Sequence, residues 1–350
     1  MIALLMAAGV ALATSLVGTR FLIVWLRQRG IGQPIHEDVP DAHQGKAGTP
    51  TMGGIAIVAG AVVGYLVAHT RSGMDFSASG LLLIALVIGS GAVGMTDDWI
   101  KISQERNLGL SKAAKSVGLL SAAIGFSVLA VTVTDVHTNL SFTRFDNFEG
   151  FDLGPVLWCA WAVLLIVGCT NAVNLTDGLD GLAGGSAIFG FAAFTVIAFW
   201  AFRNAGQLGS LANYQIPDAL DLAVVAAALV GSTTGFLWWN ATPARIFMGD
   251  TGSLAIGGGL AGLALLLNTQ LLLPLIGGLF VFETASVIVQ VAGFRLFSKR
   301  PFRMAPIHHH YELAGWPQTT IIVRFWILAG LSTAIALGLF LADYIHLTGQ

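Results

Sequence analysis

Charged residues are scarce in this chain. Only 10% of its 350 residues are Asp, Glu, Lys or Arg, whereas 55% are hydrophobic and the mean hydropathy is +0.77. Soluble domains carry about 25% charged residues, so the composition excludes a soluble globular protein and indicates a polytopic membrane protein. The net charge of −2 says little about partners, and we expect no nucleic acid among them.

Cysteine is almost absent as well. Cys159 and Cys169 fall in one predicted helix, where a separation of ten residues is roughly 15 Å. Because disulfide-bonded Cα atoms lie within about 7 Å of each other, these two cannot pair, and they are most simply membrane-core residues. No cysteine lies near the histidine-rich segment towards the C-terminus, which argues against a zinc site there.

Long apolar runs are abundant, and they predict ten membrane spans of the usual roughly 17–25 residues. The first is expected to stay as an anchor, because no small-residue cleavage site follows a short apolar core. Only 268–270 separates the eighth span from the ninth, so nine is the alternative count. We therefore predict an all-α polytopic membrane protein in which residues 1–350 form one domain. The spans lie near residues 2–26, 53–70, 80–96, 116–134, 154–170, 183–202, 219–239, 252–268, 271–296 and 320–346.

The basic residues predict the orientation of these spans. With ten spans, one set of loops holds 12 Lys and Arg residues and the opposite set holds three, Arg71, Arg144 and Arg203. Cytoplasmic loops carry the basic excess, so the first set is predicted to be cytoplasmic and both termini to lie outside. A miscount by one span would scramble this split, which favours ten. The outside loop at 135–152 suggests no function.

Polar segments interrupt the apolar runs on the predicted cytoplasmic side. Carboxylates are expensive in lipid, so their clustering there indicates phosphate and metal chemistry at the inner membrane surface. Asp97 and Asp98 end the third span, where they can meet water, a cation or Lys101. Mg²⁺ prefers carboxylate and phosphate oxygens, so the pair fits a Mg²⁺-diphosphate site. An interfacial helix cap is the alternative for a bare Asp-Asp pair.

A second segment repeats polar residues at every third position, with Asn171, Asn174, Asp177 and Asp180. Residues three apart are neighbours on a helix, but these steps drift around an ideal one. Either the four side chains address more than one group, or the segment is a loop. A plain turn between two spans would explain the glycines but not two amides and two carboxylates.

A third segment, at 245–253, contains Gly-Asp-Thr-Gly-Ser before the eighth span. Backbone N–H groups at a helix start form an anion site, while Asp250 would serve equally well as an N-cap. Phe247 offers a flat surface on which a base could stack, or anchors the membrane interface.

The fourth segment contains His308, His309 and His310 after a basic run. Consecutive histidines project in different directions and do not easily chelate one zinc ion, so contacts with phosphate are favoured over metal binding. The alternative is an interfacial loop whose basic residues only set the orientation.

The ninth span contains Pro274, Gly277 and Gly278, which allow a kink. Its Glu283 marks a functional site by default, and a structural hydrogen bond between helices explains it equally well.

In this order, the segments resemble the phospho-N-acetylmuramoyl-pentapeptide transferase family, a branch of the polyprenyl-phosphate N-acetylhexosamine-1-phosphate transferase superfamily. The resemblance covers essentially the whole chain, and the histidine stretch distinguishes this branch from relatives with N-acetylglucosamine donors. It is carried by GTPTMGG at 48–54, Asp97-Asp98, NAVNLTDGLDG at 171–181, FMGD at 247–250 and APIHHHYEL at 305–313.

The resemblance implies ten transmembrane helices, a homodimer and an active site facing the cytoplasm at the bacterial plasma membrane. It also implies a reaction of peptidoglycan synthesis. Phospho-MurNAc-pentapeptide would pass from UDP-MurNAc-pentapeptide to undecaprenyl phosphate, with Mg²⁺ as cofactor, giving lipid I and UMP.

Carried over by position, the resemblance makes Asp250 a Mg²⁺ ligand. Asp97 and Asp98 become catalytic, either as the base for the lipid phosphate or as organisers of the metal and diphosphate. Lys115 matches a family lysine, with Lys112 as its competitor. The nucleoside pocket would comprise Asn174, Asp177, Gly178, Leu179, Asp180 and Phe247. Further substrate-binding residues would be Lys46, Thr51, Asn171, Gln290, His308, His309 and His310.

Phosphoryl transfer needs charge neutralisation and positioning more than covalent help, so we expect direct attack by the lipid phosphate rather than an aspartyl intermediate. A sister transferase using UDP-N-acetylglucosamine is the nearest alternative. A transporter or flippase is another, since intramembrane acids and broken helices also mark carriers. The gathering of most acids at one face, without an evident inverted repeat, argues against a carrier.

Overall fold

The computed structural model describes residues 1–29, 48–103, 109–148, 151–204, 214–216 and 218–348. Its regular structure is helical, apart from one isolated bridge between Asn139 and Asp152. The all-α prediction is thereby confirmed. A helix forms the hydrogen bonds of its own backbone internally, as lipid requires of an apolar chain. The helices are α1 (Ile2–Gln28), α2 (Gly54–Ser72), α3 (Ala78–Ser103), α4 (Lys112–Val133), α5 (Gly154–Thr176), α6 (Leu182–Asn204), α7 (Ala219–Asn240), α8 (Gly249–Leu266), α9 (Leu273–Ile276), α10 (Gly278–Phe297), α11 (Ile307–Leu313) and α12 (Gln318–Thr348).

Nine helices in the described residues are long and apolar enough to cross a membrane, where ten spans were predicted. They are α1 to α7, α10 and α12, in agreement with a polytopic membrane protein. The predicted span at 252–268 is the 18-residue α8, which is not among the nine. Its first turn is polar and its composition is rich in glycine, so protein rather than lipid surrounds it. Nearly every α8 residue is buried.

Glycine allows α8 to lie at the centre of the bundle, packed against α3 and α5. A Cβ at Gly94 of α3 would collide with the backbone of Asp250, and one at Gly257 of α8 would collide with the backbone of Thr170. Small residues at these crossings let helix backbones approach closely. The close crossing of α3 and α8 positions the candidate site.

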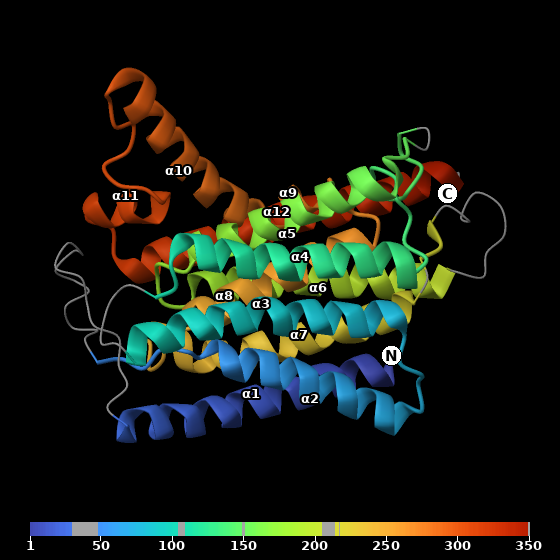
Figure 1. Cartoon of the computed structure of the whole chain (residues 1–350), viewed down its shortest axis with the longest axis horizontal. Helices are drawn as coiled ribbons and strands as arrows, with labels where there is room; N and C mark the ends of the chain where they lie inside the picture. Colours follow the sequence, from blue (N-terminus) through green and yellow to red (C-terminus); the bar gives the residue numbers. More distant parts are fainter. Residues whose placement is uncertain (30–47, 104–108, 149–150, 205–213, 217, 349–350) are drawn as a thin grey trace.

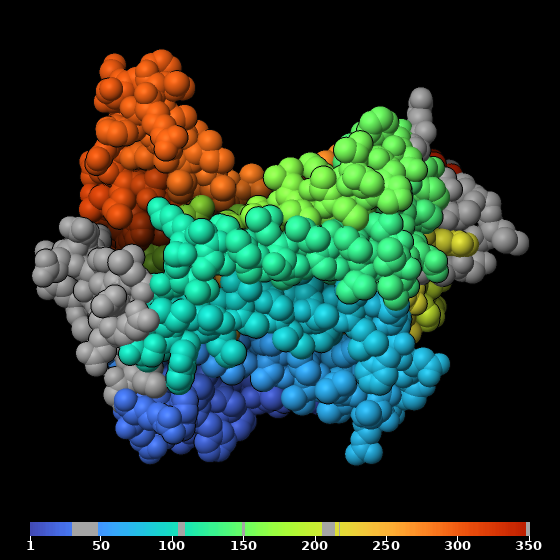
Figure 2. All heavy atoms as spheres, viewed as in Figure 1, coloured from blue at the N-terminus to red at the C-terminus, as the bar shows by residue number. Residues whose placement is uncertain are grey.

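The predicted ninth span is divided in two. A short α9 ends and α10 begins on either side of Gly277. The hydroxyls of Ser332 and Thr333 on α12 donate to the carbonyls of Leu275 and Ile276, which satisfies backbone groups that the break leaves free. After the break α10 leaves the bundle at an angle (Figure 1). A broad hollow separates it from the α5 side of the molecule (Figure 2).

The two chain termini lie at the same end of the bundle, opposite α11 (Figure 1). Which end faces the cytoplasm remains a prediction.

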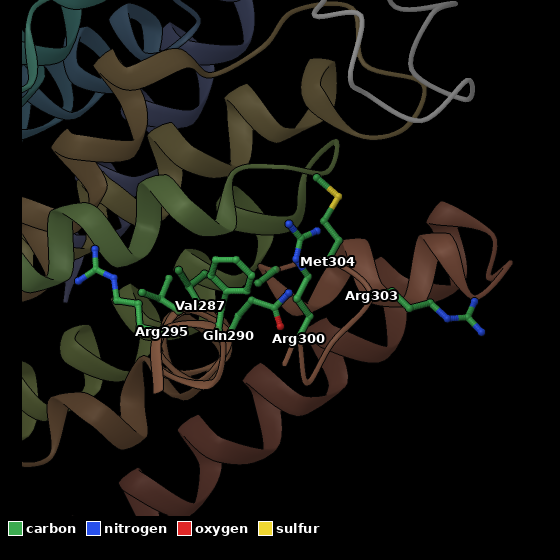
Figure 3. Close-up of a pocket in the computed structure, with 9 residues that line it drawn as sticks. Val287, Gln290, Arg295, Arg300, Arg303 and Met304 are labelled. Atoms are coloured by element: carbon green, nitrogen blue, oxygen red, sulfur yellow. The ribbon is translucent and has the colours of Figure 1, made fainter. Parts of the chain in front are cut away.

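A cavity of about 350 Å³ lies between α10 and the segment that follows it (Figure 3). The amide of Gln290 holds this segment, because it donates to the carbonyl of Phe302 at 3.1 Å and accepts from the N–H of Phe302 at 3.0 Å. The lining combines apolar side chains such as Val287 with the guanidinium groups of Arg295 and Arg300. The Gln290 side chain is thus engaged in building the wall of the cavity.

Candidate active site

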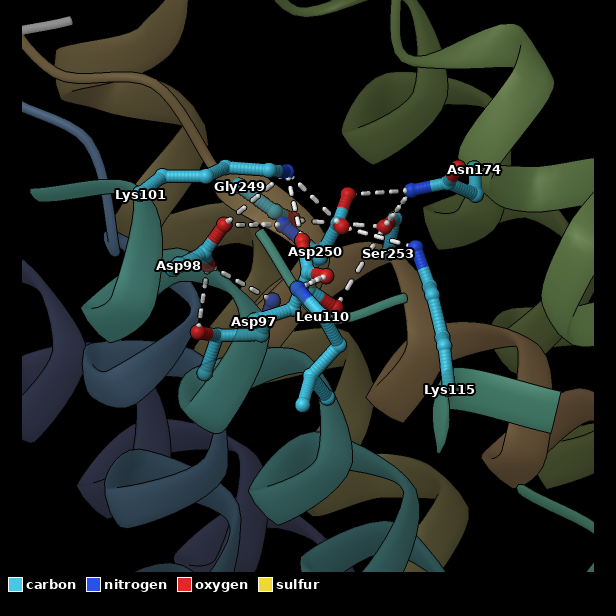
Figure 4. A network of polar contacts seen from close by, with 10 residues as sticks. Asp97, Asp98, Lys101, Leu110, Lys115, Asn174, Gly249, Asp250 and Ser253 are labelled. Atoms are coloured by element: carbon cyan, nitrogen blue, oxygen red, sulfur yellow. Dashed lines mark hydrogen bonds and ion pairs between the residues drawn. The ribbon is translucent and has the colours of Figure 1, made fainter. Parts of the chain in front are cut away.

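Three aspartates meet where the last turns of α3 approach the first turn of α8 (Figure 4). Asp97 and Asp98 are 3% and 2% exposed, and together with Asp250 they offer carboxylate oxygens that all lie within 4.8 Å of one another. Adjacent residues on α3 and one residue on α8 therefore form a single acidic cluster.

The two neighbouring aspartates of α3 have different environments. Asp98 accepts hydrogen bonds from the backbone N–H groups of Asp250 and Thr251, at 3.1 and 3.0 Å, and from the Thr251 hydroxyl at 2.7 Å. It therefore binds the N-terminus of α8, where free N–H groups and the helix dipole favour an anion. Asp97 instead accepts from the N–H of Leu110 at 2.8 Å.

Two lysines bring positive charge to the cluster. Lys101 Nζ lies 2.6 Å from Asp97 and 3.0 Å from Asp250, and Lys115 Nζ lies 2.7 Å from Asp250. Lys112 is exposed at the start of α4, so the structure brings Lys115 rather than Lys112 to the aspartates. Three carboxylates against two ammonium groups leave one negative charge in excess when all five are ionised.

The last turn of α5 and the residues that follow it also approach the cluster. Asn174 donates to Asp250 at 2.7 Å and to the Ser253 hydroxyl at 2.9 Å. Asp177 follows directly after α5. Burial, and then the negative charges of Asp250, Asp98 and Asp180, raise the pKa of the Asp177 carboxyl well above its ordinary value.

The turn between α5 and α6 is joined to the segment before α8. Asp180 accepts from the N–H of Ala244 at 3.1 Å, and Gly181, whose φ of +81° favours glycine, donates to the Asn240 side chain at 3.0 Å. Two motifs that lie about 70 residues apart in the sequence are therefore fixed to one another.

The segment before α2 lies against the same region. The N–H of Phe247 donates to the carbonyl of Pro50 at 2.8 Å, and Gly53 donates to the carbonyl of Phe247 at 2.9 Å. Thr51 is buried, and a Cβ at Gly249 would lie 3.0 Å from its hydroxyl. Lys46 lies outside the described residues.

The three histidines belong to α11, and each uses Nδ1 to contact a different partner. His308 Nδ1 lies 3.1 Å from Glu283 Oε2, and His309 Nδ1 lies 2.7 Å from Glu312 Oε2. His310 Nδ1 accepts from the backbone N–H of Arg303 at 3.1 Å. A Cβ at Gly178 would collide with His308 Nε2, so α11 lies against the turn between α5 and α6.

The described contacts bring most of the predicted site residues together, but not all of them. The amide of Asn171 donates to the carbonyl of Val167 within its own helix and is exposed. Thr251 and Ser253 are members of the cluster that sequence reasoning missed. Their only signal is position in the first turn of α8, next to Asp250.

The cluster fits a divalent cation of the Mg²⁺ type. Carboxylate oxygens are the preferred protein ligands of Mg²⁺, and the excess negative charge favours a cation. Asp250 would hold it, with Asp97 beside it, whereas the oxygens of Asp98 already accept three hydrogen bonds from α8.

Comparison with known proteins found a family model, a signature and relatives that match this chain. A family model described as glycosyl transferase family 4 matches residues 79–268, and signature 1 of phospho-N-acetylmuramoyl-pentapeptide-transferase matches residues 46–58. Two relatives bear the name phospho-N-acetylmuramoyl-pentapeptide-transferase. One, from Streptomyces griseus, is 49% identical over 97% of this chain and 98% of its own length. The other, from Saccharopolyspora erythraea, is 50% identical over 99% of both chains.

Proposed function

Because this chain belongs to the phospho-N-acetylmuramoyl-pentapeptide-transferase family, within glycosyl transferase family 4, we propose that it performs the reaction in the family name. It transfers phospho-MurNAc-pentapeptide from UDP-MurNAc-pentapeptide to undecaprenyl phosphate, and it produces lipid I and UMP in peptidoglycan synthesis. Near-identity in length and 49–50% identity to relatives with this name carry the proposal.

The reaction is Mg²⁺-dependent in this proposal, with Asp250 as the metal-holding residue. A bound Mg²⁺ would stabilise negative charge on the diphosphate and on the leaving UMP. Lys101 and Lys115 lie beside the same carboxylates, and their positive charges would help to stabilise the negative charge of a diphosphate bound there. When substrate arrives, the two ammonium groups exchange carboxylate contacts for phosphate contacts.

The two adjacent aspartates have separate roles. Asp98 positions the first turn of α8, and thereby Asp250, through the three hydrogen bonds that it accepts. Asp97 is the residue that accepts a proton from the acceptor phosphate at a carboxylate oxygen. An oxygen of that phosphate then attacks the sugar-bearing phosphorus directly, while the bond from phosphorus to the bridging oxygen breaks and UMP leaves.

The surrounding motifs bind the donor. The segment at 171–181, made of the end of α5 and the turn after it, forms the nucleoside pocket with Phe247. Asn174 contacts Asp250 there, and Asp177 lies within reach of its charge. Lys46, Thr51, Gln290 and the three histidines contact the remaining donor and the acceptor. We place the site at the cytoplasmic face of the bacterial plasma membrane, with both termini outside, and expect the chain to act as a homodimer.

Turnover of the purified full chain with both substrates and Mg²⁺ tests this function. We expect UMP release that depends on Mg²⁺, is matched by lipid product, and is absent in Asp250→Ala. Turnover with UDP-N-acetylglucosamine alone would assign the chain to the sister branch, and no turnover with either donor would favour a carrier. UMP release without acceptor would replace direct attack by a two-step mechanism.

A further inference from the structure

Glu283 is a buried carboxylate for which the transfer reaction has no use so far. It lies in the second turn of α10, is fully buried, and belongs to the helix that leaves the bundle. A buried carboxylate without a partner is strongly unfavourable. In the described residues its two oxygens make no hydrogen bond, and the fully buried His308 lies against them with Nδ1 3.1 Å from Oε2.

The partners of the three histidines determine which ring nitrogen carries a proton. His308 Nδ1 and both Glu283 oxygens make no hydrogen bond in the described residues, although Nδ1 lies 3.1 Å from Oε2. A carboxylate only accepts hydrogen bonds, so this contact can become one only with a proton on Nδ1 of His308. The contact of Glu312 with His309 likewise requires a proton on Nδ1. His310 is the opposite case, because a backbone N–H donates to its Nδ1 and the proton of the neutral ring must be on Nε2.

The other nitrogen of His308 points towards the proposed nucleoside pocket. Nε2 abuts Gly178, whose lack of a side chain leaves room for the ring, and it has no hydrogen-bond partner within the described part of the chain. Asp177, beside that glycine, faces the acidic cluster. The ring thus bridges α10 and the turn between α5 and α6.

From this geometry we propose that Glu283 is a positioning residue that acts through His308. It holds the ring in the Nδ1–H form, so that Nε2, buried against Gly178, is the unprotonated acceptor at the edge of the nucleoside pocket. The arrangement resembles the way in which carboxylates orient histidines that bind metals or act as bases. It also gives the departure of α10 from the bundle a function, because the break at Gly277 lets α10 bring Glu283 to α11. This role rests on the proposed transfer reaction.

The test is a histidine ¹⁵N spectrum of the labelled full-length chain, compared between wild type and Glu283→Gln. The signals of His308 are identified by their loss in His308→Gln. We expect Glu283→Gln to alter the Nδ1 and Nε2 signals of His308, since an amide can donate to Nδ1, and to lower kcat about 10–100-fold, the usual loss on removing such an orienting partner. Glu312→Gln should alter His309 signals and leave those of His308 unchanged.

Two controls separate positioning from stability. Thr284→Val, on the same helix at a hydroxyl that donates to the carbonyl of Phe280, should change neither the His308 signals nor kcat. In the background of His308→Gln, Glu283→Gln should lower kcat no further, because the residue through which it acts is gone. Unchanged His308 signals in Glu283→Gln, or a full additional loss in the double variant, would overturn the proposal. If wild type turns over no donor at all, the transfer reaction fails, while the spectra still decide the role of Glu283.

Discussion

Two buried carboxylate sites lie towards opposite ends of α3, and they are built differently. At the start of the helix, Asp221 of α7 accepts from the Tyr65 hydroxyl at 2.9 Å, and from the hydroxyl and N–H of Ser77 at 2.7 and 3.0 Å. His69 Nε2 lies 3.0 Å from its other oxygen. One carboxylate therefore has four protein contacts, and it joins α2 and α7 to the start of α3.

At the other end of α3, three carboxylates share two ammonium groups. The first site surrounds one carboxylate with hydroxyl and N–H donors and an imidazole, whereas the second gathers three carboxylates around two ammonium groups. Burial alone therefore does not distinguish a structural carboxylate from a functional one. The distinction depends on which charged and hydrogen-bonding groups surround each carboxylate.

Exchanging the carboxylate for an amide should lower turnover at one of the two sites and stability at the other. We expect Asp250→Asn to lower turnover about 10³-fold, because it removes a metal ligand and the partner of both lysines. Asp221→Asn should leave turnover per folded molecule unchanged and lower stability by about 1–3 kcal/mol, since buried donors lose their acceptor. Kinetic and thermal-unfolding measurements on both variants check this. Similar turnover losses in the two would contradict the distinction.

The contrast between structural and reactive carboxylates also holds within the acidic cluster. Asp98→Asn should reduce both turnover and thermal stability, because an amide NH₂ would face the N–H groups of α8 that Asp98 now accepts. Asp97→Asn should reduce turnover by about 10²-fold, as expected for loss of a general base, with the unfolding temperature of wild type retained. A fall in unfolding temperature for Asp97→Asn, and none for Asp98→Asn, would reverse the assignment of roles.

Two glycine substitutions test whether the contact between α11 and the turn after α5 matters for turnover. Gly178→Ala places a Cβ against the His308 ring and should lower turnover about 10-fold or more. Gly184→Ala, a few residues further on, meets its nearest atom at 3.9 Å and should be tolerated. The ratio of kcat values for the two variants gives the result, and equal values would mean that His308 does not depend on this contact.

The smallest effect is expected at the lysines of α4. Lys115→Met removes one charged hydrogen bond to Asp250 and should lower turnover about 10-fold. Lys112→Met, three residues earlier on an exposed position, should change turnover less than about 2-fold. Parallel assays of the two variants test the choice of lysine, and a larger loss in Lys112→Met would show it to be wrong.

Much of the fold could be predicted from composition and spacing. Nine apolar runs and the break at Pro274 to Gly278 correspond to helices and to a real interruption. The burial of α8 could not be predicted, because apolar periodicity does not say whether lipid or protein surrounds a helix. That depends on which glycines lie at the helix crossings, as Gly94 of α3 and Gly257 of α8 show.

The candidate site was predictable as a set of residues but not as a set of contacts. The spacing of Asp97 and Lys101 already places them one helical turn apart. The sequence alone does not reveal that Asp98 binds the N-terminus of α8 whereas its neighbour Asp97 does not. Likewise, the Glu283 partner lies 25 positions away across two helices, which no local pattern encodes.

Titration calorimetry of Mg²⁺ into the full chain, without substrates, tests most directly whether the excess charge at the acidic cluster is a cation site. The measurement compares wild type with Asp250→Asn and Asp221→Asn. We predict one bound ion per chain in wild type and in Asp221→Asn, and none in Asp250→Asn. Mg²⁺ binding by Asp250→Asn as tight as that of wild type, or its loss in Asp221→Asn, would contradict the account.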